Sequence, residues 1–292
     1  MLSHWMSPTV AIVGAGQLGC ALGRRLHELG WQIGSVVTRN KKSAAVAVRA
    51  IGGGQPHARL TRQVVGADLI LIATPDSVLA RVAEGLARIG GDELQGKVVL
   101  HTSGALDRRA LSPLERLGAA TGSLHPMQAF SEHTAPRLDG TMMAIEGTPV
   151  ALRRARQIAR SLGGIPMRIE GRNKAAYHAA GALVAWHSLA LIEAATRMLM
   201  SLNFSRRHTM RALLPLLRET LDNFERLGPR VAWTGPLPRG EYNTIAAHAE
   251  AMRKYPREFL ETYAVLSRLA MTLFSPAPQK MRTRLARALA EK

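Results

Sequence analysis

A short glycine-rich stretch near the start of the chain constrains the fold more than any other feature. Residues 9–13 are mostly β-branched and apolar, as in a buried β-strand. Gly14, Gly16 and Gly19 follow in a Gly-x-Gly-x-x-Gly pattern, and leucines recur every three or four residues over 18–29, as on one face of an amphipathic helix. A strand, this glycine pattern and a helix together predict a dinucleotide-binding turn.

Each glycine of this turn has its own expected role. Gly14 allows the tight turn, Gly16 allows a pyrophosphate to approach the backbone, and Gly19 allows the helix to pack closely on the strand. The unpaired N–H groups at the start of the helix then face the anion. We therefore expect cofactor contacts from Gly14, Gly16, Gln17, Leu18 and Gly19.

The residues after the second predicted strand, 31–37, indicate which dinucleotide binds. NAD-binding proteins usually place Asp or Glu about 20 residues beyond the glycine turn, where it binds the ribose 2′-hydroxyl. This chain has Thr38, Arg39 and Asn40 there and lacks an acid. Because a carboxylate would repel a 2′-phosphate whereas these side chains can donate to it, NADP is expected rather than NAD. Alternatively, Arg39 and the two lysines that follow form a solvated loop.

The order of the predicted elements divides the chain into two domains. Apolar runs typical of strands alternate with helical patterns up to residue 169, which predicts a doubly wound, mainly parallel α/β sheet over residues 1–170. Beyond Gly171 the strand signals stop and long apolar-periodic segments follow. Residues 171–292 are therefore expected to form an all-helical domain, with helices over 174–202, 205–227, 244–254, 256–275 and 278–291.

Polar residues follow several of the predicted parallel strands. Thr74 and Pro75 come after the apolar run 67–73, Ser103 comes shortly after the strand 97–100, and His125 comes after the strand 119–124. Ligands bind at the carboxyl ends of the strands in open α/β sheets. We therefore expect Thr74 and Pro75 beside the cofactor, with Ser103 and His125 near its nicotinamide.

The first predicted helix of the second domain supplies two further candidates. Lys174 and His178 are four residues apart and hence on one helix face. Hydride transfer to a carbonyl or imine needs a proton donor and groups that stabilise the developing charge. The hypothesis is that His125 or His178 donates the proton, while Lys174 and Ser103 orient and polarise the substrate. Alternatively, Lys174 begins a helix at the surface and His178 is a hydrogen-bonded core residue.

Composition excludes several classes of protein. With 47% hydrophobic and 21% charged residues, the chain has an ordinary globular composition. The net charge of +18 is spread over the chain without a basic tail, which favours a solvated basic surface over nucleic-acid binding. The single cysteine, Cys20, excludes an internal disulfide. The ten histidines lack metal-ligand spacing, so no metal site is expected.

The most apolar segment, residues 175–195, bears on localisation and assembly. It contains polar residues such as His187 and Glu193, so a buried helix is expected rather than a membrane span. Residues 1–8 lack the pattern of a signal peptide, and a cytoplasmic protein is expected. The segment is apolar all round, which predicts a homodimer through the helical domain.

The motifs occur in an order that resembles a known family. These motifs are the glycine turn and the segments 73–76, 101–105, 123–130, 177–180 and 234–240. Together they resemble Rossmann-like proteins with a C-terminal DUF2520 domain, which are similar in architecture to pyrroline-5-carboxylate reductases, β-hydroxyacid dehydrogenases and NADP:coenzyme F420 oxidoreductases. The resemblance implies a Rossmann domain, NADP binding and a helical dimerisation domain like the C-terminal domain of 6-phosphogluconate dehydrogenase. Lys174 resembles in position the lysine of the β-hydroxyacid dehydrogenases, although His178 follows in place of their asparagine.

Two functions remain open at this point. The first is an NADP-dependent oxidoreductase that moves a hydride between the nicotinamide and a small carbonyl, imine or hydroxy-acid substrate. The second is a non-catalytic dinucleotide-binding sensor or scaffold. Polar groups at three separate strand ends favour the enzyme, since such convergence is typical of active sites.

Overall fold

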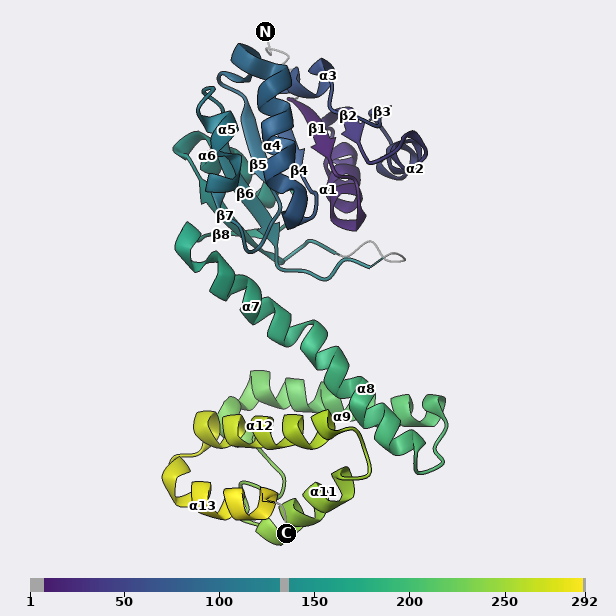
Figure 1. Cartoon of the computed structure of the whole chain (residues 1–292), viewed down its shortest axis with the longest axis vertical. Coiled ribbons are helices and arrows are strands. Elements are labelled where there is room, and N and C mark those ends of the chain that lie inside the picture. The colour runs from purple at the N-terminus through teal and green to yellow at the C-terminus, as the bar shows by residue number, and fades with distance from the viewer. Residues whose placement is uncertain (1–7, 132–136, 291–292) are drawn as a thin grey trace. The chain divides into compact units, whose positions relative to one another are not determined.

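The computed structural model describes residues 8–131 and 137–290, and the chain forms two compact units, Met1–Ala185 and Trp186–Lys292. The first unit is built on one eight-stranded sheet with the strand order β3-β2-β1-β4-β5-β6-β7-β8 (Figure 1). Its strands are β1 (Thr9–Val13), β2 (Gln32–Val37), β3 (Gln55–His57), β4 (Leu69–Ile72), β5 (Val98–His101), β6 (Ala120–Pro126), β7 (Met142–Gly147) and β8 (Ile165–Arg168).

The topology confirms the predicted doubly wound sheet. Neighbouring strands are parallel throughout, except that β6 and β7 are antiparallel. The chain runs outward from β1 to β3 and then returns to β4 on the other side of β1. The strand order therefore reverses between β1 and β4, and the carboxyl ends of these strands are where such sheets bind ligands. The sequence analysis did not predict β3, whose three residues Gln-Pro-His are polar and lie at the sheet edge, where proline is tolerated.

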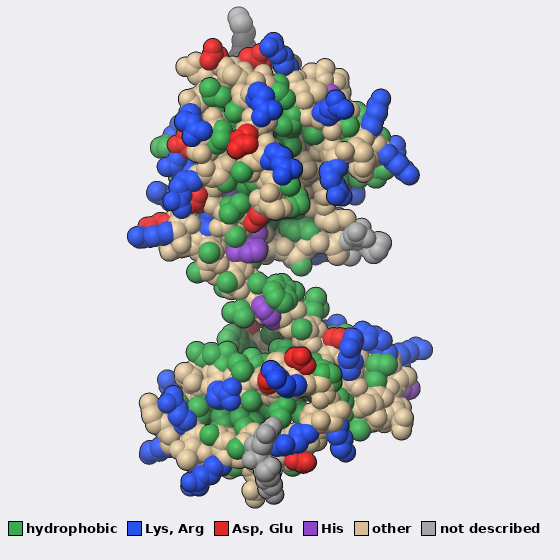
Figure 2. Space-filling model, viewed as in Figure 1, with side chains coloured by type: hydrophobic (Ala, Val, Ile, Leu, Met, Phe, Trp, Pro, Cys, Tyr) green, Lys and Arg blue, Asp and Glu red, His purple; other side chains and the backbone are tan. Residues whose placement is uncertain are grey.

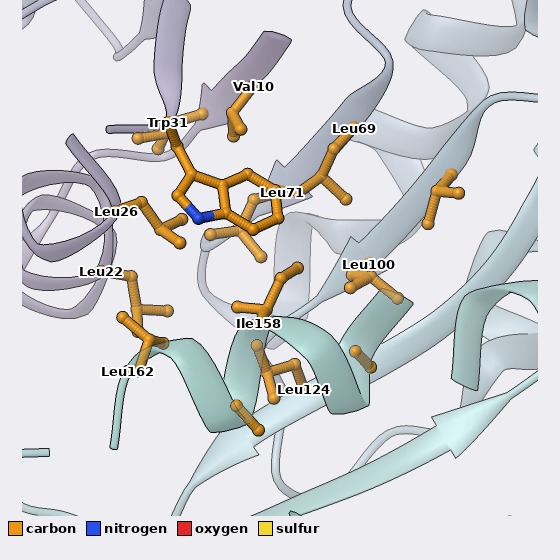
Figure 3. Close-up of a cluster of buried hydrophobic side chains, with 14 of the residues drawn as sticks. Val10, Leu22, Leu26, Trp31, Leu69, Leu71, Leu100, Leu124, Ile158 and Leu162 are labelled. Carbon is orange, nitrogen blue, oxygen red and sulfur yellow. The ribbon is translucent and has the colours of Figure 1, made fainter. Parts of the chain in front are cut away.

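Alternate residues of the strands belong to two hydrophobic cores, one on each face of the sheet. Val10 and Ile12 of β1 belong to one core, and Ala11 and Val13 belong to the other. Successive side chains of a strand point to opposite faces, so a strand covered on both faces must be apolar throughout. Figure 3 shows the first core, where Trp31 lies among leucines of helices and strands. Each fully buried Leu or Ile of these cores stabilises the fold by about 1.5–3 kcal/mol.

Helices supply the other half of both cores. The first core includes residues of α1, α2 and α6, and the second includes residues of α3, α4 and α5. The helices of this unit are α1 (Gln17–Glu28), α2 (Lys41–Ile51), α3 (Arg62–Val65), α4 (Asp76–Gly90), α5 (Ser112–Glu115), α6 (Pro149–Ser161) and α7 (Lys174–Val184). Although the last strand ends at Arg168, α7 still belongs to this first compact unit.

The glycine turn between β1 and α1 has the geometry that its sequence predicts. Gly14 has φ +94°, a left-handed conformation that side chains other than glycine rarely adopt. A Cβ atom on Gly19 would overlap the carbonyl oxygen of Gly14, because the helix packs directly against the turn. A Cβ atom on Gly16 would meet no heavy atom of the described residues within 4 Å. Protein packing therefore requires glycine at 14 and 19 but leaves room for a side chain at 16.

This difference predicts that two alanine substitutions will differ in their effect on stability. Gly19→Ala should destabilise the protein by about 1–3 kcal/mol, because the overlap forces α1 away from the turn. Gly16→Ala should leave the midpoint of thermal unfolding unchanged, since its backbone has φ −78° and the site is open. Thermal denaturation of both variants beside the wild type checks this, and equal losses of stability would contradict it.

The second unit consists of helices, as the sequence predicts. They are α8 (Trp186–Met200), α9 (Arg206–Leu227), α10 (Pro229–Ala232), α11 (Tyr242–Met252), α12 (Arg257–Phe274) and α13 (Pro278–Leu289). The predicted helix over 174–202 is divided at Ala185 into α7 and α8. The buried hydrophobic cluster of this unit is small and consists of Leu237, Ile245, Met271 and Leu285, while Ala249 is buried outside it.

The apolar segment 175–195 is not buried within a single chain, so the expectation of a buried helix is wrong at this level. Leu183 and Val184 of α7 are 64% and 78% exposed, and Leu189 of α8 is 67% exposed. Within the described residues, the helical stretch Gly171–Met200 is long and apolar enough to cross a membrane by length and composition alone. Apolar periodicity predicts that a face is covered, but it cannot tell what covers it.

Candidate functional site

A cavity of about 420 Å³ lies at the carboxyl ends of β1, β4, β5 and β6, within the first unit. Its walls come from the glycine turn, from the segments after β4 and β5, from the end of β6 and the loop that follows it, and from α7. The lining residues are Gly16, Gln17, Leu18, Ala73, Thr74, Pro75, Asp76, Thr102, Ser103, Gly104, His125, Pro126, Gln128, Phe130 and His178.

Two histidines and a tyrosine meet on one side of this cavity. Nδ1 of His125 lies 3.0 Å from the Tyr177 hydroxyl, and the His125 ring stands edge-on to the His178 ring with centroids 5.7 Å apart. A Cβ atom on Gly104 would lie 2.6 Å from Cδ2 of His178 and 2.7 Å from Nε2 of His125. Glycine at 104 therefore allows both rings to approach the loop after β5.

Burial determines the protonation state of this group. It lowers the pKa of His125 to about 4, and the positive charge of Lys174 acts in the same direction. Burial also raises the pKa of Tyr177 to about 12. His125 is therefore uncharged at neutral pH, and its ring forms a hydrogen bond with the Tyr177 hydroxyl.

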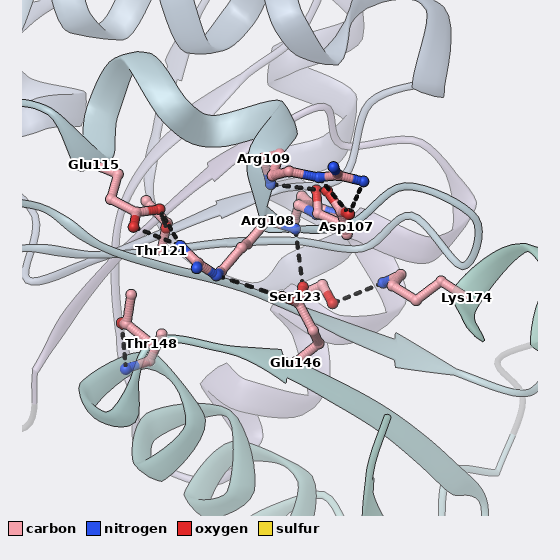
Figure 4. Close-up of polar contacts among 11 residues, drawn as sticks. Asp107, Arg108, Arg109, Glu115, Thr121, Ser123, Glu146, Thr148 and Lys174 are labelled. Atoms are coloured by element: carbon pink, nitrogen blue, oxygen red, sulfur yellow. Dashed lines mark hydrogen bonds and ion pairs between the residues drawn. The ribbon is translucent and has the colours of Figure 1, made fainter. Parts of the chain in front are cut away.

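Lys174 is fully buried behind the cavity wall rather than lining the cavity. Its Nζ donates to the carbonyl oxygen of Ser103 at 2.8 Å. It also donates to Oγ of Ser123 at 2.7 Å, as Figure 4 shows. Burial lowers the pKa of Lys174 to about 8, and the negative charges of Glu146, Asp107 and Asp76 limit the shift. The lysine thus joins the start of α7 to the loop after β5 and to β6.

The Ser103 hydroxyl organises the loop after β5. It donates to Oδ2 of Asp76 at 2.9 Å and accepts hydrogen bonds from the backbone N–H groups of Ala105 and Leu106. Its single proton is therefore directed at the Asp76 carboxylate, and the hydroxyl fixes the wall of the cavity.

His101, the last residue of β5, supports this loop from beneath. The N–H of Ser103 donates to its Nδ1 at 3.2 Å, so its Nε2 carries the proton and donates to the Asp107 carbonyl oxygen at 3.2 Å. Burial lowers the pKa of His101 to about 3. The neutral ring is therefore a fixed part of the wall.

The glycine-turn end of the cavity fits a dinucleotide. Gly16, at the N-cap of α1, has no side-chain cap among the described residues, so the first N–H groups of the helix remain available to an anion. The open space over Gly16 leaves its backbone accessible to a pyrophosphate. The buried Oγ1 of Thr74 has no hydrogen-bond partner within the described part of the chain and can bind a ligand oxygen or nitrogen.

The predicted 2′-phosphate residues lie at the end of β2. Thr38 donates to the carbonyl oxygen of Asn40 at 2.8 Å, and Oδ1 of Asn40 accepts from the N–H of Ser43 at 2.8 Å, which caps α2. Arg39 is exposed and forms no ion pair within residues 8–131 and 137–290. Of the three side chains, the Arg39 guanidinium and the Asn40 amide nitrogen are therefore the groups whose donors are not used in these contacts.

Comparison with known proteins agrees with this architecture. A model of a Rossmann-like domain matches residues 6–126, and a model of a domain of unknown function, DUF2520, matches residues 141–270. The chain combines a Rossmann-like domain with a DUF2520 domain. The resemblance that the motifs suggested is confirmed.

Solved structures with the same fold share little sequence with the chain. A "putative NADP oxidoreductase" from Bacteroides fragilis is 22% identical with a TM-score of 0.76, over 90% of this chain and 98% of its own. A reductive aminase from Aspergillus terreus, solved with NADPH and ethyl-5-oxohexanoate, is 17% identical with a TM-score of 0.67, over 85% and 87%. A pyrroline carboxylate reductase from Plasmodium falciparum with NADP bound is 12% identical with a TM-score of 0.57, over 97% and 98%. A search of curated proteins finds no significant match.

The structure brings only some of the predicted site residues together. Eight of them line the single cavity described above: Gly16, Gln17, Leu18, Thr74, Pro75, Ser103, His125 and His178. The others lie outside its lining: Gly14, Gly19, Thr38, Arg39, Asn40 and Lys174. Gly14 and Gly19 shape the turn, whereas Lys174 acts on the cavity through the loop and helix that it joins.

Three residues with a distinct part in the site were given no role in the sequence analysis: Asp76, Gly104 and Tyr177. Asp76 lies at the end of the motif 73–76 and lines the cavity beside Ser103. Gly104 and Tyr177 lie within motifs of the sequence analysis, yet neither was assigned a role there. Tyr177 follows Lys174 by three residues, so the helical spacing that selected His178 could also have selected it. Within the described residues, no cluster of His, Cys, Asp and Glu could hold a metal ion.

The buried histidines predict a loss of stability in acid. In the unfolded chain they take up protons near pH 6.5, whereas in the fold His101 and His125 stay neutral down to about 3 and 4. The free energy of unfolding should therefore fall as the pH drops below 6.5, by up to about 1.4 kcal/mol per pH unit for each histidine. His101→Gln keeps a donor and an acceptor but does not titrate, so it should lose less stability over this range.

Thermal midpoints measured at several pH values between 6.5 and 4 test this expectation. His27→Gln, at an exposed site on α1, is the control and should follow the wild type. A His101→Gln profile parallel to the wild-type profile would show that His101 does not cause the acid loss.

Proposed function

We propose that the chain is an NADP(H)-dependent oxidoreductase acting on a small carbonyl, imine or hydroxy substrate. The observation that carries this proposal is a single cavity lined at one end by the glycine turn and at the other by His125 and His178. A dinucleotide that enters along the turn would place its nicotinamide toward the histidines. The relatives solved with NADPH or NADP support the choice of cofactor.

The residues have separate tasks in this proposal. The backbone around Gly16 and the start of α1 would hold the pyrophosphate, and Thr74 would bind nearer the nicotinamide. When bound, the cofactor supplies or accepts a hydride at the nicotinamide C4. His178 and the neutral His125 present hydrogen-bonding groups to the reacting atom, while Lys174 and Ser103 hold the wall that carries them.

The cavity favours an enzyme over a non-catalytic sensor or scaffold. A sensor needs only the nucleotide-binding end of the site. Here two histidines, a serine and a carboxylate also converge beside that end, and convergent polar groups in one pocket are typical of catalysis.

The choice of nucleotide gives a direct test. The wild type should bind NADPH more tightly than NADH, because the exposed Arg39 guanidinium would pair with a 2′-phosphate. Arg39→Asp should weaken NADPH binding by more than about tenfold, or about 1.4 kcal/mol, through loss of a charge-assisted contact. Arg49→Asp makes the same charge change at the other end of α2 and should have little effect. Fluorescence titrations measure all four affinities, and equal affinities of the wild type for both nucleotides would contradict the assignment.

We also propose that the chain forms a homodimer through its helical unit. The buried hydrophobic cluster of this unit has four members, while most of the exposed large hydrophobic side chains in the described chain belong to the same unit (Figure 2). A cavity of about 570 Å³ there is lined mainly by apolar side chains of α8 and α12. The polar surface of α8 carries the ion pair between Glu193 and Arg197, which favours a protein partner over lipid.

The homodimer predicts a measurable mass. Light scattering at micromolar concentration should give twice the 31.7 kDa of one chain. Leu189→Glu places a charge on the exposed apolar face of α8 and should shift the protein toward the monomer. Val46→Glu changes a half-exposed apolar side chain on α2 of the first unit and should leave the mass unchanged. A wild-type mass near that of one chain would reject the proposal.

A further inference from the structure

The described lining of the cavity contains a carboxylate but no lysine or arginine. The carboxylate belongs to Asp76. Oδ2 of Asp76 accepts the Ser103 hydroxyl proton at 2.9 Å. Asp76 forms no ion pair with a described residue, so its second oxygen remains an acceptor beside the cavity.

The nearby cation is not available to a ligand. Lys174 is fully buried, and its Nζ already donates to the Ser103 carbonyl and the Ser123 hydroxyl. A substrate carboxylate in this cavity would therefore meet the Asp76 carboxylate without a lysine or arginine in the described lining to compensate it. Like charges placed together repel each other, so this charge distribution disfavours carboxylate-bearing substrates and favours a positive charge.

Reduction of a ketone leaves an alkoxide that needs a proton. The Ser103 proton already points to Asp76 and His125 is neutral, which leaves His178 as the histidine of the cavity wall that would have to supply it. A protonated imine needs no such donor, because its nitrogen already carries the proton before the hydride arrives.

Resting on the proposed function, we infer that the substrate is a small iminium ion without a carboxylate and that Asp76 binds its N–H group. The hydride adds to the iminium carbon, the electron pair of the C=N π bond becomes the nitrogen lone pair, and NADP⁺ is released with a neutral amine. The amine then takes a proton from solvent, so the step needs no further reactant. In the reverse direction, the amine is oxidised to the iminium ion.

A matched pair of ring substrates tests the inference. 1-Pyrroline and Δ1-pyrroline-5-carboxylate share the same cyclic imine and differ in the carboxylate. Loss of NADPH absorbance should show kcat/KM about a hundredfold higher for 1-pyrroline, since the carboxylate faces Asp76. Asp76→Asn should lower kcat/KM for 1-pyrroline about tenfold and narrow the preference. Asp92→Asn removes the same charge at an exposed site outside the cavity and is the control.

The outcomes separate this inference from the proposed function. Equal or better use of the carboxylate-bearing ring would overturn the inference and leave an NADPH-dependent enzyme. An Asp76→Asn variant that weakens NADPH binding but keeps the ring preference would assign Asp76 to the cofactor and also overturn it. The wild type could also bind NADPH but reduce neither ring and fail to bind pyrrolidine. That result would overturn the inference as well. Absence of NADPH binding to the wild type would instead refute the proposed function.

Discussion

The candidate site depends on the buried ammonium group of Lys174. An unpaired charge in a protein interior costs several kcal/mol, so such a group is retained only where hydrogen bonds and opposite charges compensate it. Lys174 has two strong hydrogen bonds, to Ser103 and Ser123, and three carboxylates act on it through space. Because the same residue begins α7, these bonds also fix where Tyr177 and His178 lie relative to β5 and β6.

The parts of the fold that follow from local pattern could be predicted from the sequence. The strand, glycine turn and first helix are determined by residue type and spacing, and the alternation of elements predicts the doubly wound sheet. The direction in which a side chain points in the folded protein could not be predicted in the same way. Helical spacing places Lys174 and His178 on one face, but it does not tell that the lysine turns into the protein while the histidine lines the cavity.

Asp76 shows a related limit of prediction from the sequence. The sequence Thr-Pro-Asp lies at a predicted strand end, where ligands bind, but an Asp at the start of a helix also fits a capping role, and local pattern cannot decide between the two. The carboxylate becomes part of a site only because the next strand in the sheet brings Ser103 to it across 27 positions of sequence. The solved relatives cannot supply this information either, since at 12–22% identity they establish the fold, whereas chemistry resides in particular side chains.

The small core of the helical unit has a consequence for how the protein folds. A unit of this length whose buried hydrophobic cluster has four members has little internal driving force to offset the entropy of ordering its chain. Whatever covers its apolar faces must contribute to its folding free energy, so binding and folding of this unit are thermodynamically linked. In the proposed homodimer, the stability of this unit would depend on protein concentration as well as sequence, and dilution would act on it as a denaturant does.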